Sequence, residues 1–176
     1  MPYWFLLLSA CNREIPILVN DWCAPETTAT VTEVIDGDTI RIDSGDTIRL
    51  LGIDAPELFH DGMSECSSED SFICCYGSDA DTWLTELLPA GTIVKIGFDL
   101  ECEDIYNRTL AYVWLPDAAD TGGSDLFINE EAIQSGYARL FDEDIGLARD
   151  IRYYQRFQDA QTVSQSNGNG LWSACY

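Results

Sequence analysis

Hydrophobic and polar residues alternate along much of the first half of the chain, as they do in half-buried β-strands. Residues 30–53 are rich in Val, Ile and Thr, and this composition predicts a β-hairpin or a meander. The pattern breaks at Asp43–Asp46, where a two-residue turn at Ser44-Gly45 would join two strands. Alternation returns in residues 92–98 and 109–115, which we also expect to be strands.

Three later segments carry hydrophobic residues at the spacing of an amphipathic helix. They are residues 79–88, 129–135 and 148–163, and glycine or proline follows each of them within a few positions. Residues 58–77 are polar and rich in cysteine, show neither period, and predict a long loop. No internal repeat is visible. Five strands with about three helices predict an α+β domain built on a small closed β-barrel.

The N-terminal residues differ in character from the rest of the chain. Residues 1–10 form an apolar run that is too short to span a bilayer. Leu8–Cys11 resembles the lipobox of bacterial lipoproteins, in which the cysteine becomes the lipidated first residue. We therefore expect residues 1–10 to be a signal segment, Cys11 to be lipidated, residues 11–28 to tether the membrane-bound Cys11 to the domain, and residues 29–176 to be the domain. The alternative is an apolar N-terminal strand that buries a free thiol.

Composition and charge limit the partners of this domain. Of the 176 residues, 46% are hydrophobic, which is enough for one buried core and predicts a single domain. The chain has 31 acidic and 9 basic side chains and a net charge of −22. This balance excludes a nucleic-acid-binding protein that works through a broad basic surface. A polyanionic substrate would have to be bound by a few locally placed groups.

Six cysteines remain if Cys11 carries lipid, and an even number in an exported chain predicts three disulfides and an extracytoplasmic location. Fifteen pairings are possible, although the neighbours Cys74 and Cys75 are expected to have different partners. A thiolate metal site is disfavoured because the chain has no C-x-x-C pair and His60 is its single histidine. The candidate cysteines are Cys23, Cys66, Cys74, Cys75, Cys102 and Cys175.

Charged residues interrupt the predicted strands in two segments, Val34–Ile40 and Arg49–Glu57. With a turn at Ser44-Gly45, Asp38 lies diagonal to Arg49 on the same face of the hairpin, so a carboxylate and a guanidinium point into one pocket. Strict alternation sends Asp54 to the opposite face. Joint action of these side chains therefore requires a bend in the second strand, for which Gly52 is the candidate.

A third segment, Glu101–Tyr112, leads from a polar stretch into a strand and places Arg108 at the junction. In order along the chain, the three segments contain the motifs VIDGDTI, RLLGIDAPE and DIYNRTLAYVW, which INEEAIQSGYA and GLWS follow. Together they resemble the staphylococcal nuclease (thermonuclease) family over residues 29–173. The resemblance implies a five-stranded OB-type barrel with about three helices. It also implies a monomeric nuclease that cleaves phosphodiester bonds of DNA or RNA with little sequence specificity.

The resemblance also implies roles for individual residues. Two carboxylates and one backbone carbonyl would bind a single Ca²⁺, two arginines would hold the phosphate, a glutamate would activate or orient water, and a tyrosine would contact the nucleotide. Hard oxygen ligands of this kind suit calcium. In that order, the residues are Asp38, Asp54, Ala55, Arg49, Arg108, Glu57 and Tyr106.

Some positions depart from the family pattern. Ala55 replaces the usual threonine, Ile105 a lysine and Asn107 a glycine, and an acidic, cysteine-bearing stretch follows Glu57. Two alternatives follow: a catalytically inactive OB-type module that binds nucleic acid or protein, and a lipoprotein domain whose acids bind calcium only for stability. The presence of both arginines and the glutamate favours the nuclease.

Overall fold

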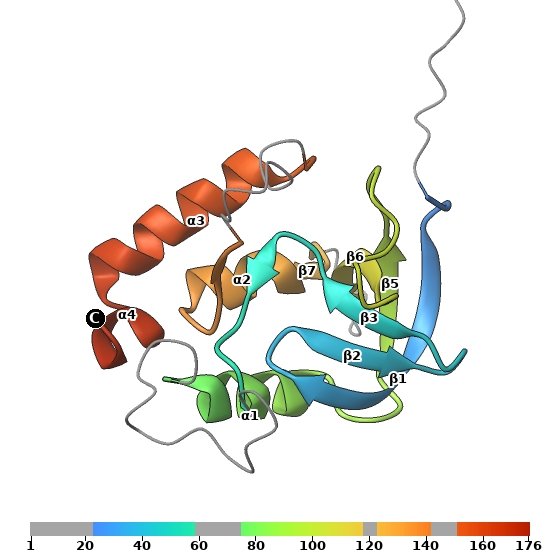
Figure 1. Cartoon of the computed structure of the whole chain (residues 1–176), viewed down its shortest axis with the longest axis horizontal. Helices are drawn as coiled ribbons and strands as arrows, with labels where there is room; N and C mark the ends of the chain where they lie inside the picture. The colour runs from blue at the N-terminus through green and yellow to red at the C-terminus, as the bar shows by residue number, and fades with distance from the viewer. Residues whose placement is uncertain (1–22, 59–74, 118–122, 142–150) are drawn as a thin grey trace, which may run out of the picture.

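The computed structural model describes residues 23–58, 75–117, 123–141 and 151–176. Five strands form a barrel in the order β3-β2-β1-β5-β6, and parallel pairing of β3 with β6 closes it (Figure 1). The predicted α+β architecture on an OB-type barrel is confirmed. The barrel strands are β1 (Thr27–Asp36), β2 (Thr39–Ile42), β3 (Thr47–Leu50), β5 (Ile93–Gly97) and β6 (Thr109–Leu115).

Alternation along these strands builds the core. Val31, Ile40, Ile48, Ile96 and Val113 each come from a different barrel strand, and at most 2% of any of them is exposed. Branched aliphatic side chains pack well on a pleated surface, which is why these segments form strands. The barrel is thus filled by side chains and provides a rigid base for the loops that leave it.

Two short pairings extend the barrel. β4 (Ile53–Asp54) pairs antiparallel with β8 (Arg139–Leu140), and β7 (Leu126–Phe127) pairs with the end of β6. The first of these pairings brings a segment from late in the chain next to Asp54. The sequence pattern gave no sign of β8.

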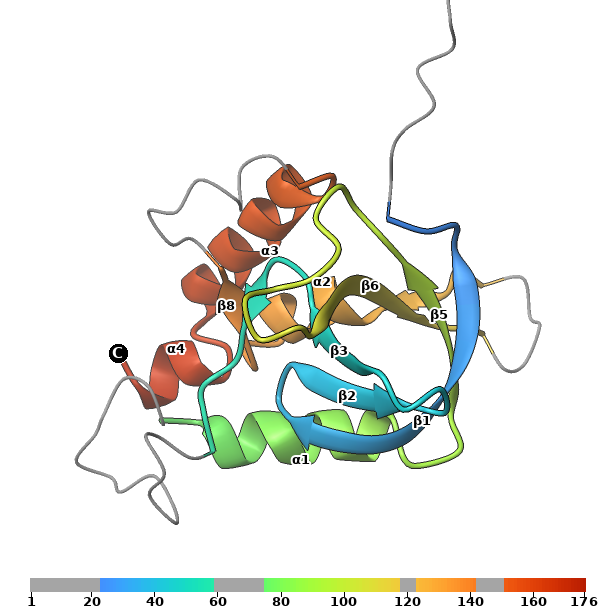
Figure 2. The same cartoon turned by 45° about the vertical axis from the view of Figure 1, so that its right-hand side comes forward.

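Four helices of the described ranges pack around the barrel: α1 (Gly77–Leu87), α2 (Ile128–Gln134), α3 (Tyr154–Asn167) and α4 (Leu171–Ala174). α1 runs along one side of the barrel, whereas α2 lies between the barrel and α3 (Figures 1 and 2). The first three correspond to the predicted helices. α3 begins at Tyr154, since the preceding described residues form a turn, and Gly168 ends it with φ +65°.

The hairpin between β2 and β3 differs from the prediction by one residue in register. Thr39 pairs with Arg49 and Arg41 with Thr47, so the loop has three residues and not two. Gly45 has φ +92°, which is typical of a three-residue loop that ends in a left-handed residue. The predicted Ser44-Gly45 two-residue turn was therefore wrong, because a glycine at this position serves both loop types.

A sharp bend at Gly52 separates β3 from β4, as the sequence predicted. Gly52 has φ +81°, and a Cβ atom there would lie 2.4 Å from Ile151 Cδ1 and 2.9 Å from Phe157 Cε2. Any other residue would therefore meet both backbone strain and a packed core. The bend turns Asp54 toward the side of the barrel that holds Arg49.

The folded region begins before the predicted domain boundary at residue 29. β1 starts at Thr27, and Cys23 forms a disulfide with Cys102. A second disulfide joins Cys75 to Cys175. The lipobox, the lipidation candidate Cys11, and Cys66 and Cys74 lie outside the described residues. Within the described ranges, no helix has both the length and the apolar character to cross a membrane.

Candidate active site

Arg49 lies at the centre of the candidate site, and its side chain is only 12% exposed. Its Nη1 is 2.9 Å from Asp38 Oδ2 and donates a 2.8 Å hydrogen bond to the carbonyl of Ile53, and its Nη2 is 3.2 Å from Asp54 Oδ1. The predicted convergence of Asp38 and Arg49 is confirmed, and the Gly52 bend adds Asp54 to the group. A planar guanidinium with several donors can hold two carboxylates and a carbonyl at once.

Asp38 is the second residue of the two-residue connection between β1 and β2, and it is buried. Its Oδ2 accepts a 2.7 Å hydrogen bond from the Ala55 amide, and its Oδ1 accepts one from the Thr39 hydroxyl. The close approach depends on Gly37, where a Cβ atom would lie 2.9 Å from the Ala55 Cβ. Asp38 and Ala55, predicted to act together, are thus in direct contact.

Burial raises the pKa of the Asp38 carboxyl to about 7, and the negative charge of Asp36 adds to this effect while Arg49 opposes it. The folded protein therefore binds a proton that the unfolded chain releases near pH 4. In a chelating buffer, the free energy of unfolding should fall by a few kcal/mol as the pH rises from about 4 to 7.

The matching variant is Asp38→Asn, which removes this titration and should flatten the same part of the profile. Urea titrations of both proteins between pH 4 and 8 measure the difference. Parallel profiles would show that Asp38 does not carry the effect. The comparison between variants is necessary because the large net negative charge destabilises the fold in the same direction as pH rises.

Glu57 lies just beyond β4, at the surface end of the same group. Partial desolvation raises the pKa of its carboxyl, as do the charges of Asp36 and Asp54, whereas Arg49 and Arg108 lower it. Because those four charges act on it, Glu57 lies in their common field. A carboxylate with a raised pKa is a better proton acceptor near neutral pH than an ordinary surface glutamate.

Arg108 immediately precedes β6, as predicted. Its Nε donates a 2.6 Å hydrogen bond to Asp104 Oδ2, and Asp104 Oδ1 accepts from the backbone amides of Tyr106 and Arg108. Asn107 has φ +60°, a left-handed conformation that glycine adopts most easily and that asparagine tolerates. This geometry is consistent with asparagine at a position where the family pattern has glycine.

Tyr106 and Ile105 form the tip of that loop and are 71% and 88% exposed. The Arg108 guanidinium lies 5.5 Å from the centre of the Tyr106 ring, within the range of a cation–π contact. The structure therefore places the predicted substrate-contacting tyrosine beside one of the predicted phosphate-binding arginines.

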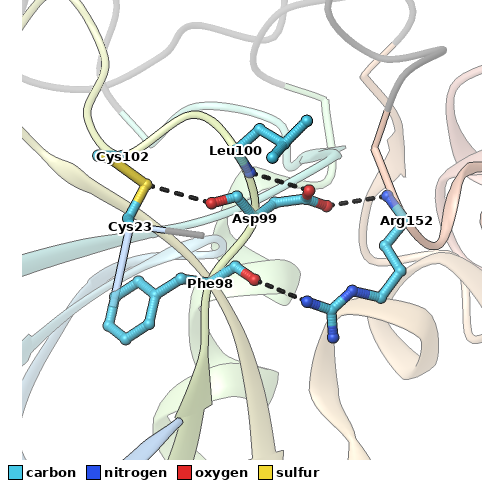
Figure 3. Close-up of a disulfide and its surroundings, with 6 residues drawn as sticks. All are labelled: Cys23, Phe98, Asp99, Leu100, Cys102 and Arg152. Carbon is cyan, nitrogen blue, oxygen red and sulfur yellow. Dashed lines mark hydrogen bonds between the residues drawn. A yellow bond between two sulfur atoms is a disulfide. The ribbon is translucent and has the colours of Figure 1, made fainter. Parts of the chain in front are cut away.

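The base of the loop is fixed by a buried carboxylate and a disulfide (Figure 3). Asp99 accepts hydrogen bonds from the Tyr112 hydroxyl and the Arg152 amide, and the Cys23 amide donates to its carbonyl. Cys23 forms a disulfide with Cys102, which lies three residues after Asp99 in the same loop. Residues 99–102 are thus anchored to the N-terminal segment, to β6 and to the chain before α3.

Arg139 belongs to the site although the sequence gave no reason to select it. It lies on β8, and its Nε and Nη2 are 3.1 Å and 2.8 Å from Asp54 Oδ2. Asp54 is therefore held from both sides, by Arg49 on one oxygen and by Arg139 on the other. The signal that could have found Arg139 was the resemblance of its segment, INEEAIQSGYA, to the family, since Arg139 is the next residue.

Asp38 and Asp54 are the two carboxylates that approach Arg49 at this site. In the ranges that the structure describes, no three Cys, His, Asp or Glu side chains are grouped as a metal cluster. Both carboxylates contact the Arg49 guanidinium, and the negative charge of Asp36 acts on Asp38. Two carboxylates with backbone and water oxygens are a donor set that calcium accepts.

A closed five-stranded barrel that carries these arginines and carboxylates on β3, β4 and the connections beside β2 and β6 has the features expected of a phosphodiester-cleaving OB-fold protein. The family model described as staphylococcal nuclease homologue matches residues 47–174. The chain therefore belongs to the staphylococcal nuclease family, and it is a nuclease. The match includes Arg49, Asp54, Glu57 and Arg108.

Similar proteins agree with this assignment. A thermonuclease of Staphylococcus hyicus is 31% identical over 85% of this chain and 78% of its own length. The endonuclease YhcR of Bacillus subtilis is 27% identical over 96% of this chain, which spans only 14% of that protein. A thermonuclease of Staphylococcus intermedius is 38% identical over 49% of this chain and 48% of its own length.

Proposed function

We propose that this nuclease hydrolyses phosphodiester bonds of DNA and RNA with little sequence preference, in a calcium-dependent reaction. The observation that carries the proposal is the convergence of Arg49, Asp38 and Asp54, with Glu57 in the field of both predicted arginines. With 31 acidic and 9 basic side chains, the protein is poorly suited to bind a polyanion through a broad basic surface. Substrate would thus be bound locally, which accounts for a nuclease of such negative charge.

In this proposal the side chains have separate tasks. Glu57 accepts a proton from water or orients it for attack on phosphorus, while Arg49 and Arg108 each donate to oxygens of the phosphate. A guanidinium keeps its charge at any ordinary pH and can bind two phosphate oxygens at once. Their donors stabilise the negative charge that grows on those oxygens in the transition state. Tyr106 contacts the nucleotide beside Arg108.

Asp38, Asp54 and the carbonyl of Ala55 would hold the calcium ion. When bound, the ion supplies positive charge that polarises the phosphate and orients it for attack. Arg49 contacts both carboxylates and so fixes their positions relative to each other. A site with only two charged ligands is expected to bind calcium weakly, with a Kd of about 10⁻⁴ M or poorer.

The two described disulfides support an extracytoplasmic location, since such bonds persist in oxidising compartments. We propose that the protein is exported and attached to the bacterial membrane through a lipid on Cys11. Mass spectrometry of the N-terminal peptide from membranes would detect diacylglyceryl-modified Cys11. An unmodified or uncleaved N-terminus would leave a soluble exported nuclease.

Digestion of plasmid and single-stranded DNA tests the nuclease proposal, with wild type and Glu57→Ser each in calcium and in EGTA. Wild type should cleave only with calcium, and Glu57→Ser should cleave about 10²–10⁴-fold more slowly, the usual contribution of a proton-transfer group. Glu86→Ser on α1 is the matched control, because it changes an exposed glutamate elsewhere and should keep full activity. A wild type that binds DNA without cleaving it would instead indicate an inactive binding module.

A further inference from the structure

The residues around Cys175 extend the active site beyond the predicted positions. Glu57, Arg139 and Tyr176 line one small cavity of about 80 Å³, together with both sulfur-bearing residues of the Cys75–Cys175 disulfide. α4 and the start of α1 lie at the same end of the molecule (Figures 1 and 2). The segment that carries Tyr176 is therefore held next to the proposed water-activating glutamate by a covalent bond.

Tyr176 presents an aromatic ring at the rim of this cavity. The ring lies on Trp172, with 4.8 Å between the ring centres and an angle of 33° between the planes, and 62% of Tyr176 is exposed. One face of the ring is thus supported by a second aromatic side chain while much of the residue meets solvent. A supported, exposed aromatic ring is the arrangement on which nucleobases stack in proteins that bind single strands.

Arg139 supplies positive charge to the same cavity. It is bound to Asp54, interacts with Tyr176, and still has a side chain that is 51% exposed. The protein has only 9 basic residues against 31 acidic ones, so few other side chains can bind a phosphate group. The cavity has room for a few water molecules and is too small for a base, so a base would remain at the rim beside Tyr176.

We propose that Arg139, Tyr176 and Trp172 form a nucleotide-binding subsite next to the scissile phosphate. Arg139 binds a backbone phosphate of the neighbouring nucleotide, and the base of that nucleotide stacks on Tyr176, which Trp172 supports from behind. This inference rests on the proposed nuclease function. It extends that function by naming the ligand class, a single-stranded polynucleotide of at least two residues, and by giving the Cys75–Cys175 disulfide a role in substrate binding.

The test compares a single-stranded oligonucleotide with a mononucleotide p-nitrophenyl ester, which lacks a neighbouring nucleotide. Tyr176→Ala should raise KM for the oligonucleotide about 5- to 10-fold, the effect of losing one base–aromatic stack, and leave KM for the ester unchanged. Tyr176→Phe keeps the ring but loses the hydroxyl near Arg139, so its KM for the oligonucleotide should stay much closer to wild type than that of Tyr176→Ala. Val163→Ala, an exposed apolar change on α3, is the control for surface substitutions.

An unchanged KM for the oligonucleotide, or an equal rise for both substrates, would overturn the subsite. Arg139 is a poorer first variant, because it also holds Asp54. Oligonucleotide binding in EGTA, followed by fluorescence anisotropy, separates this inference from the nuclease proposal. If wild type cleaves neither substrate, the nuclease proposal fails. The subsite then stands if Tyr176→Ala weakens oligonucleotide binding about 5- to 10-fold and Tyr176→Phe weakens it much less. Otherwise the subsite fails as well.

Discussion

Alanine in place of Arg108 is expected to slow phosphodiester hydrolysis by about 10²–10³-fold, the loss that follows removal of one transition-state donor. The same change should alter the free energy of unfolding by less than about 1 kcal/mol, because the Arg108–Asp104 ion pair is partly exposed. Asp104 would keep its two backbone hydrogen bonds, so the loop should retain its shape. Measurement of kcat on an oligonucleotide, with thermal unfolding of the same sample, checks both parts.

Two further variants make the Arg108 result specific. Arg156→Ala removes an exposed arginine that pairs with Glu130 on α2, and it should leave kcat unchanged. Arg108→Lys keeps the charge but loses the planar fork, so it should fall between wild type and the alanine variant. Full activity in Arg108→Ala would remove this residue from the catalytic group.

Replacement of Cys75 and Cys175 by serine is expected to lower the free energy of unfolding by about 2–5 kcal/mol. The bond joins positions separated by 100 residues in sequence, and closing so long a loop in the unfolded chain removes much of its conformational freedom. For a protein of this size the loss corresponds to a fall in Tm of about 5–20 °C. Calorimetry of the double variant and of wild type gives the value directly.

The second bond provides the comparison for this result. Replacement of Cys23 and Cys102, separated by 79 residues, should give a loss of similar size, since the loop-length term changes only logarithmically. The two variants should differ in KM for oligonucleotides, because only Cys75–Cys175 lines the cavity with Glu57. An unchanged Tm in both variants would show that neither bond contributes to stability.

Much of the fold could be predicted because strand and helix periods are local properties of the sequence. Alternating Val, Ile and Thr identified the hairpin. Alternation also predicted the strand of residues 109–115, which has the same bounds in the structure. The register of the hairpin could not be predicted, since Gly45 permits loops of two or three residues and the neighbouring strands decide between them. The short β8 has only two residues, which is too few to show a period.

The candidate site shows the same division. Contacts of Arg49 with Asp38 and Asp54 were expected from the hairpin and from the bend at Gly52. The observed register, which pairs Thr39 with Arg49, differs from the one used to argue the contact with Asp38. Arg139 could not be found in this way, because it reaches Asp54 through a strand pairing between distant parts of the chain. The disulfide partners of Cys23 and Cys75 were equally inaccessible, since connectivity depends on the closed fold.

The parallel seam between β3 and β6 has a consequence for how activity develops during folding. In this seam Arg49 of β3 pairs with Leu110 of β6. Arg108 immediately precedes β6, so the seam joins the segments that carry the two arginines. The two arginines are brought together by this seam, which is a contact of long sequence separation, and such contacts form slowly. The pair of phosphate-binding arginines, Arg49 and Arg108, should therefore assemble late in folding, when the barrel closes. A chain that ends before β6 cannot form this seam, and we expect it to be catalytically silent.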